Sequence, residues 1–247
     1  MTRRFFLLAS AAGLCTLMLG ACRRSKAPEP ATLTPEERAY RESAERMNHR
    51  FGRPGFLLIV DAMAGEEFFA VEFYGEHARS PLYRRSLQTL KNKSSFPWSG
   101  PVPERVRIIW RDTDEYLLND DGVTSRRAGR IIGDEWIEVG TRIPQALIDD
   151  LKRDPHGALR LKFRMSNQGT MLGWDIERRP GYDQKKAVEM IKQGEMSPYY
   201  PPVYSFAGGD FRERTWTDHD VNGQRIRTFH PGWYIDRQTG HKIETDY

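Results

Sequence analysis

The residues with the most suggestive metal-binding spacing lie near the C-terminus, in Asp218–Gly223 (DHDVNG). Oxygen donors at positions one, three and five and a glycine at position six match the first half of a calcium-binding loop. The later ligand positions do not match, because position nine is Ile226 and position twelve is Phe229, where a bidentate glutamate is required. Asn222-Gly223 is also a strong signal for a two-residue hairpin turn. We favour the metal-free hairpin over the calcium loop.

Histidines and nucleophiles form no other recognisable constellation. No two histidines have the i, i+4 spacing of a helical zinc pair, and the chain lacks the G-x-S-x-G turn of α/β-hydrolases. A serine hydrolase whose catalytic residues come from distant segments stays an alternative. We expect a protein without enzymatic activity, cofactor or metal, and we interpret its histidines as surface or capping residues: His49, His77, His156, His219, His230 and His241.

The clearest chemical signal lies at the N-terminus, at Cys22. Two arginines precede an apolar run from Phe5 to Met18, which is shorter than the roughly 20 residues that span a bilayer and is typical of a secretory signal peptide. Leu19–Cys22 (LGAC) resembles the bacterial lipobox, in which cleavage between Ala21 and Cys22 leaves a cysteine whose thiol carries lipid. An ordinary signal peptide that contains a cysteine is the alternative.

The export route and the final membrane have signals of their own. Thr2–Leu7 resembles a twin-arginine signal, but Leu8 replaces the lysine that often follows it, so a plain positively charged segment is favoured. Arg23 follows the lipid site, whereas retention in the inner membrane commonly uses aspartate there. The sequence predicts a protein on the periplasmic face of the cell envelope, anchored by acyl chains in the outer membrane.

Charge and cysteine content exclude several classes of protein. Removing residues 1–21 takes away Arg3 and Arg4, so the 38 basic residues become 36 against 34 acidic ones, and the net charge falls from +4 to +2. We expect no nucleic-acid partner, because that would need a clustered basic surface. Cys15 leaves with the signal peptide and Cys22 carries lipid, so no disulfide forms within the mature chain.

Three segments follow the signal peptide of residues 1–21. Residues 22–33 mix proline, alanine and charge without periodicity and predict a flexible tether. Residues 34–51 predict a helix, in which Thr34 is the N-cap, Pro35 takes the first helical position and Glu37 completes a capping box. Residues 52–247 are expected to form a single β-rich domain with C-terminal hairpins.

The body of the chain alternates apolar and polar residues in the manner of β-strands. Strands are expected at Phe56–Met63, Glu66–Tyr74, Val106–Trp110, Gly129–Val139, Leu159–Met165 and Leu172–Glu177. The last two flank the turn Ser166–Gly169, and one register keeps their apolar side chains on a shared face. That register pairs Phe163 with Leu172, Leu161 with Trp174, Leu159 with Ile176 and, on the outer face, Arg160 with Asp175.

A few short elements complete the prediction. Pro144–Leu151 is expected to form a helix, and Asp183 caps a second helix that closes at Gly194. Hairpins are expected around Asn222-Gly223 and around Asp236–Gly240. Many strands and few helices predict a mainly β, α+β fold: an antiparallel β-sandwich-like domain with a few short peripheral helices.

Two exposed stretches are candidates for binding a partner protein. The first is an acidic segment after the Val106–Trp110 strand, where carboxylates would steer a basic partner and Tyr116 would anchor it. The second is the proline-rich Ser197–Gly209, expected to be a long loop. Each has a structural alternative: a solvated loop for the first, and a lid over the sandwich edge for the second. The candidate residues are Asp112, Asp114, Glu115, Tyr116, Tyr199, Tyr200 and Tyr204.

Several stretches give the chain a family resemblance. Beside the lipobox they are Val102–Arg111 (VPERVRIIWR), Arg142–Arg164 (RIPQALIDDLKRDPHGALRLKFR), Gly173–Arg179 (GWDIERR) and the C-terminal GWYIDRQTGHKIETDY. With these the chain resembles a group of proteobacterial lipoproteins of unknown function. They are found beside type VI secretion phospholipase effectors and are regarded as immunity proteins.

The resemblance implies a function but assigns no residue a role. It implies a membrane-anchored periplasmic binding protein that neutralises a lipase effector by steric blocking. A lipoprotein that holds or assembles an envelope component is the alternative, and a periplasmic hydrolase is a further one.

Overall fold

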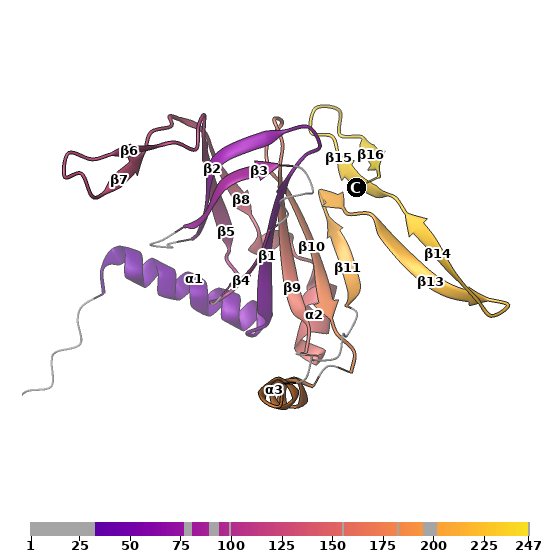
Figure 1. Ribbon diagram of the computed structural model, residues 1–247. Helices are drawn as coiled ribbons and strands as arrows, with labels where there is room; N and C mark the ends of the chain where they lie inside the picture. The colour runs from indigo at the N-terminus through magenta and orange to yellow at the C-terminus, as the bar shows by residue number, and fades with distance from the viewer. Residues whose placement is uncertain are drawn as a thin grey trace, which may run out of the picture. The chain divides into compact units, whose positions relative to one another are not determined.

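The computed structural model describes residues 33–76, 81–88, 94–98, 100–154, 156–181, 183–194 and 202–246. The signal peptide, Cys22 and all of the predicted tether except Leu33 lie outside these residues, as do Tyr199 and Tyr200. The described part is mainly β with three helices and several antiparallel sheets, so the predicted fold class is confirmed (Figure 1).

A five-stranded sheet has the order β11-β10-β9-β1-β4. Its strands are β1 (Gly55–Ala62), β4 (Ser94–Trp98), β9 (Ala158–Met165), β10 (Met171–Arg178) and β11 (Val203–Gly209). Neighbours are antiparallel except β1 and β9, which run parallel. The β9–β10 hairpin has the predicted register, with Phe163 opposite Leu172, Leu161 opposite Trp174, Leu159 opposite Ile176 and Arg160 opposite Asp175.

A four-stranded antiparallel sheet has the order β3-β2-β5-β8. Its strands are β2 (Glu67–Gly75), β3 (Leu82–Gln88), β5 (Arg105–Arg111) and β8 (Ile131–Glu138). A turn at Ala64-Gly65 carries the chain from β1 in one sheet to β2 in the other, with Gly65 at a φ of 80°. Among the described residues an apolar core joins the two sheets, and within it the Phe73 and Phe163 ring centres lie 6.1 Å apart.

Two helices contribute to this core. Helix α1 (Pro35–Phe51) buries Met47 and Phe51, and α2 (Gln145–Arg153) buries Leu147, Ile148 and Leu151. The predicted capping box of α1 is confirmed, because the Glu37 backbone N–H donates to Thr34 Oγ1 at 3.1 Å and the Thr34 N–H donates to Glu37 Oε2 at 3.0 Å. A single-turn 3-10 helix, Gly140–Arg142, precedes α2.

The second predicted short helix is α3 (Gln184–Lys192). Asp183 caps it as expected, because its Oδ1 accepts from the backbone N–H groups of Lys185 at 2.9 Å and Lys186 at 3.2 Å. Gly194, with a φ of 77°, follows its end.

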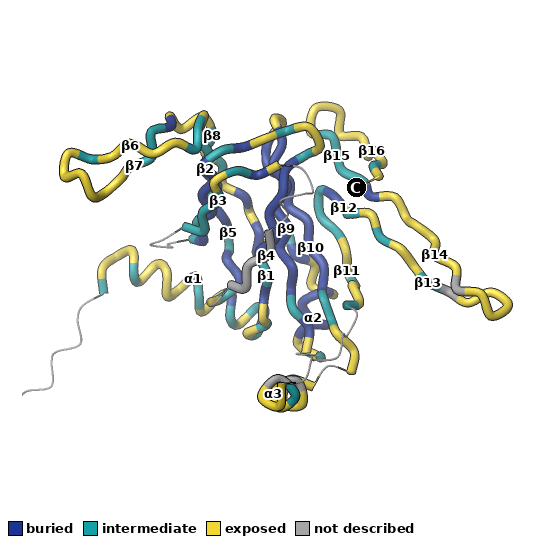
Figure 2. Tube along the Cα trace, in the orientation of Figure 1, coloured by how far each residue is buried: buried dark blue, intermediate teal, exposed yellow. Residues whose placement is uncertain are grey.

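The remaining strands form small sheets. β12 (Phe211–Arg212), β15 (Gly232–Ile235) and β16 (Lys242–Thr245) make a three-stranded sheet in the order β12-β15-β16. β13 (Thr215–Val221) and β14 (Gln224–His230) form one two-stranded hairpin, and β6 (Tyr116–Leu118) and β7 (Ser125–Arg127) form another. In Figure 2 these two hairpins are largely exposed, whereas β1, β9 and β10 are largely buried.

The predicted loop at Ser197–Gly209 is wrong for its second half. Val203–Gly209 forms β11, an edge strand that pairs with β10 on one side only. The prolines that argued for a loop, Pro198, Pro201 and Pro202, all precede Val203. Their missing N–H groups therefore interrupt no ladder in β11.

Candidate binding surfaces

The acidic segment after β5 is engaged by neighbouring arginines. Asp112 Oδ1 accepts from the Arg130 backbone N–H at 2.8 Å, and its Oδ2 lies 3.5 Å from Arg130 Nε. Asp114 pairs with Arg85 of β3, and this contact raises the pKa of Arg85. The structure therefore places Asp112 and Asp114 just beyond the end of β5, a central strand of the four-stranded sheet, with part of their charge already compensated.

Asp121, near the hairpin tip, and Glu115, at its base, also have structural roles. The Thr124 hydroxyl, together with the Val123 and Thr124 backbone N–H groups, donates to Asp121 and lowers the pKa of its carboxyl. The Glu115 carbonyl accepts from the Ala128 N–H at 2.9 Å. These bonds shape the β6–β7 hairpin, so they support the structural interpretation of the acidic segment.

Tyr116 stands at the start of β6 and remains 49% exposed. Leu117 and Leu118 follow it and are exposed at 47% and 66%. Opposite Tyr116, Arg127 turns back to the sheet, where it forms an ion pair with Glu72 and its Cζ lies 3.9 Å from the centre of the Tyr83 ring. Burial raises the pKa of Tyr83 and lowers that of Arg127. The hairpin thus has a fixed base, and its strand β6 exposes Tyr116, Leu117 and Leu118.

Tyr204 lies on the other sheet, beside a cluster of buried charges. The Arg160 guanidinium stacks 4.3 Å from the centre of its ring, and burial raises the pKa of the Tyr204 hydroxyl. The structure therefore separates Tyr204, on β11, from Tyr116, on β6, and the two do not form one surface.

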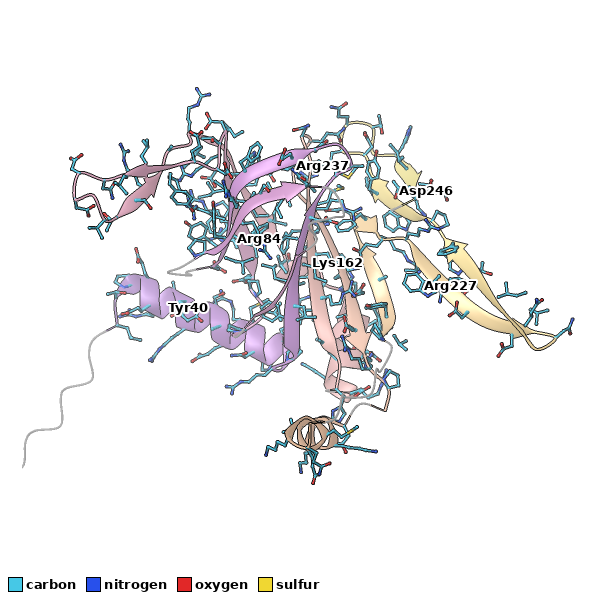
Figure 3. All side chains as sticks on the ribbon, in the orientation of Figure 1. Tyr40, Arg84, Lys162, Arg227, Arg237 and Asp246 are labelled. Carbon is cyan, nitrogen blue, oxygen red and sulfur yellow. The ribbon has the colours of Figure 1, made fainter. Side chains whose placement is uncertain are left out.

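The charge cluster lies on the face of β9 and β10 that points away from the apolar core. Arg160 Nε lies 3.0 Å from Asp175 Oδ1, as an ion pair whose geometry is too bent for a hydrogen bond. Lys162 Nζ donates to Glu213 Oε2 at 2.8 Å and also contacts Asp175 Oδ2 at 2.5 Å. Glu213, between β12 and β13, also lies 3.3 Å from Arg160 Nη2. Figure 3 labels Lys162 at this position.

This cluster corrects one expectation. The predicted pair of Arg160 and Asp175 is present, but the outer face of the sheet is buried, since Arg160, Lys162 and Asp175 are 6%, 5% and 3% exposed. Phe211 lies over Gly173, where an added Cβ would come within 3.0 Å of its ring. The C-terminal segment therefore covers a face that the sequence pattern alone makes appear solvent-facing.

The third surface was not predicted as a binding site. On one face of the β13–β14 hairpin, Trp216 lies opposite Phe229, and the two are 55% and 51% exposed. The Arg227 guanidinium lies 5.2 Å from the Trp216 ring centre and the Arg214 guanidinium 4.2 Å from that of Phe229. The predicted turn at Asn222-Gly223 could have revealed this pair, because positions 216 and 229 are equidistant from it and therefore lie opposite each other.

The calcium interpretation of Asp218–Gly223 does not fit the same hairpin. Both Asp218 carboxylate oxygens accept from Arg227, at 2.7 and 2.9 Å. Asn222 and Gly223, with φ of 53° and 80°, form the two-residue turn. Across the described residues, no group of three or more His, Cys, Asp or Glu side chains is arranged to hold a metal ion.

Histidines and pockets add little chemistry. His230 Nε2 lies 3.1 Å from Thr217 Oγ1 on the hairpin, and His156 and His241 are exposed. A shallow depression of about 530 Å³ is lined by Lys185, Val188, Glu189 and Lys192, all from α3. Because one helix supplies the whole lining, the depression is an open surface rather than an enclosed site.

Compared with protein-family models, with curated proteins and with solved structures, the chain matches none. None of the helices in the described ranges is long and apolar enough to cross a bilayer.

Proposed function

We propose that the chain is a binding protein tethered to the periplasmic face of the cell envelope through Cys22, and that it neutralises a phospholipase delivered by type VI secretion. Inhibition is steric: the bound chain covers the toxin's active site or its lipid-facing surface. The lipobox-like sequence and the family resemblance are the basis for the tether and for the class of partner.

The observation that carries a binding function is the exposed aromatic pair on the β13–β14 hairpin. Trp216 and Phe229 are 55% and 51% exposed and are flanked by Arg214 and Arg227. Tryptophan and arginine are enriched among the residues that carry most of the energy of protein interfaces. An exposed aromatic surface of this kind is expected where another macromolecule binds and buries it.

The tether adds local concentration. A phospholipase acts at the membrane surface, and an inhibitor anchored there meets it at a higher effective concentration than a free inhibitor does. Replacing Cys22→Ser is expected to weaken protection of cells at native expression, while binding to the toxin in solution persists. Equal protection by the C22S chain would remove the argument for the tether.

The direct test is to purify the chain with the product of the adjacent gene, which we expect to be a phospholipase, and to measure lipase activity with and without it. We expect a stable complex and loss of lipase activity. The double variant Trp216→Ala/Phe229→Ala is expected to weaken the complex by at least tenfold, since each truncated residue at an interface centre costs about 2 kcal/mol.

The matched control is Leu117→Ala/Leu118→Ala on the β6–β7 hairpin, which removes exposed apolar groups elsewhere and should leave the complex intact. Absence of any complex with the lipase, or full lipase activity within it, would contradict the proposal. Association with an envelope component instead would favour a structural or assembly role.

A further inference from the structure

The β13–β14 hairpin has two open edges. It is a two-stranded sheet, and no other described strand lies along β13 or β14. Along its length most residues are exposed, including Val221 and Ile226 at 42% and 40%. An isolated two-stranded hairpin is marginally stable in water, and open edges are templates for further pairing. Neither strand contains the proline or bulge with which many proteins block an edge.

The register shows which backbone groups face outward. With a two-residue turn, the closing pair Val221–Gln224 exchanges backbone hydrogen bonds, as does every second pair beyond it. The intervening pairs direct their N–H and C=O groups away from the partner strand. The outward groups of β14 therefore belong to Arg225, Arg227 and Phe229, and those of β13 to Trp216, Asp218 and Asp220.

The two edges differ in charge. Among the residues whose backbone groups face outward, β14 carries Arg227 and β13 carries Asp218 and Asp220, and Arg227 donates to Asp218 across the hairpin. A second copy related by a two-fold axis would place β14 beside β14 or β13 beside β13, which sets like charges side by side. Pairing of β13 with β14 of another copy avoids this conflict but does not close, so it would build an open chain of molecules.

We propose that the free edge of β14 receives an extended segment of the partner protein as a third strand, with acidic residues next to Arg227 and an apolar residue next to Phe229. Charge complementarity selects the segment, because opposite charges on neighbouring strands stabilise pairing and like charges oppose it. Main-chain hydrogen bonds provide affinity, and alternate side chains provide specificity, as in other cases of strand addition. The proposal rests on the proposed function only in that the chain acts by binding a protein.

The test uses the full-length chain in detergent and two synthetic peptides of about eight residues, a usual strand length. The acidic peptide carries Glu at two alternate positions, Phe at the next alternate position, and Thr or Val between them. The basic peptide has Lys in place of Glu. Fluorescence anisotropy of labelled peptides should show the acidic peptide binding about tenfold more tightly than the basic one. Its binding should slow hydrogen exchange at the Arg227 and Phe229 amides.

A charge swap provides the decisive variant. Asp218→Arg with Arg227→Glu keeps an ion pair across the hairpin and changes the charge that each edge presents. The swapped chain should lose most of the preference for the acidic peptide. Arg126→Glu on the β6–β7 hairpin is the matched control and should leave the preference unchanged.

Equal binding of the two peptides, or a preference that survives the swap, would overturn the proposal. So would protection of the same amides by self-association without peptide, which would identify a second copy as the occupant. If the chain neutralises the lipase while neither peptide binds, strand addition fails and the proposed function stands. If the acidic peptide binds as expected but no lipase is neutralised, the proposed function alone fails.

Discussion

Strands β9 and β10 bury both of their faces. One face carries apolar side chains and the other carries charged side chains. The face toward the four-stranded sheet carries Leu159, Leu161 and Phe163, all fully buried in the apolar core. The other face carries Arg160, Lys162 and Arg164, which are 6%, 5% and 1% exposed. Residues one position apart on the same strand are therefore stabilised in different ways.

The apolar face depends on area and shape. Burying a leucine side chain contributes about 1.5–3 kcal/mol, and neighbouring side chains can adjust to a substitution of similar volume. The charged face depends on specific partners. Arg164 donates to both carboxylate oxygens of Asp61, at 3.0 and 2.9 Å, and its guanidinium lies 4.4 Å from the Phe211 ring centre. A charge buried in this way is tolerated only while its partner is present.

The charged face also joins parts of the chain that the core does not join. Asp61 comes from β1, Asp175 from β10 and Glu213 from the C-terminal segment. Its polar contacts thus hold the C-terminal segment against the sheet, whereas the apolar face holds the two large sheets together. The variants below separate these two roles, beginning with the largest expected effect.

Asp61→Ala should have the largest effect. It leaves the Arg164 guanidinium buried without its carboxylate partner, at a cost of about 3–5 kcal/mol in the free energy of unfolding. Urea denaturation measures this loss. The double variant Asp61→Leu/Arg164→Met removes both charges and should recover most of the stability. A loss below about 1 kcal/mol for the single variant would mean that this pair behaves like a surface ion pair.

Leu161→Ala probes the apolar face directly behind these charges. It removes a fully buried side chain and should cost about 2–5 kcal/mol, because the surrounding core collapses only partly into the cavity. The loss should be the same at low and high salt, since no charge is involved. Leu161→Met, which conserves volume, should cost less than about 1.5 kcal/mol. A strong salt dependence of the alanine variant would show that the two faces are not independent.

Glu213→Gln tests whether the charges hold the C-terminal segment. It removes the carboxylate that lies 2.8 Å from Lys162 Nζ and 3.3 Å from Arg160 Nη2, and it should cost about 1–3 kcal/mol. Hydrogen exchange should accelerate in residues 203–246 and remain unchanged in β1 and β2. Glu244→Gln, an exposed carboxylate on β16, is the control. Faster exchange throughout the chain would assign Glu213 to global stability instead.

The sequence predicted the inner face better than the outer one. Alternation of Leu159, Leu161 and Phe163 with basic residues identified the buried face and the β9–β10 register, because a slip of one residue would expose the whole apolar set. The same alternation made the basic face look solvated. Its cover comes from Phe211 and Glu213, and a local pattern carries no information about which distant segment packs against it.

Strand pairs that are far apart in the sequence limited the fold prediction for the same reason. β1 and β9 run parallel, with Leu58 opposite Leu161, and neither strand contains a signal for the other. The hairpins were predictable, because Asn222-Gly223 and the sequence around Gly240 specify their own turns. Of the candidate binding residues, the acidic group had partners from distant strands that the sequence did not show, such as Arg85 of β3 for Asp114. That Trp216 lies opposite Phe229 follows from a two-residue turn at Asn222-Gly223, whereas the exposure of the pair does not.

The smallest effect is expected where a polar contact lies at the edge of the fold rather than inside it. Arg46 and Ser43 of α1 donate to Glu104 Oε2 at 2.9 and 3.0 Å, and the hydrogen bond from Arg46 is the main reason that the pKa of Glu104 is lowered. A carboxyl with a lowered pKa adds stability above its unfolded-state pKa, and this contribution disappears as the pH falls through the folded-state pKa.

Glu104→Gln should therefore lower the melting temperature slightly at neutral pH, and the curves of variant and parent should converge as the pH falls through the range in which carboxylates titrate. The difference should shrink with added salt, because the Arg46 side chain is 58% exposed. Glu45→Gln, on the exposed side of α1, should leave the curve unchanged. A Glu104 effect as large as that of Asp61 would mean that exposure does not govern the strength of these pairs, and the contrast between buried and peripheral charges would be lost.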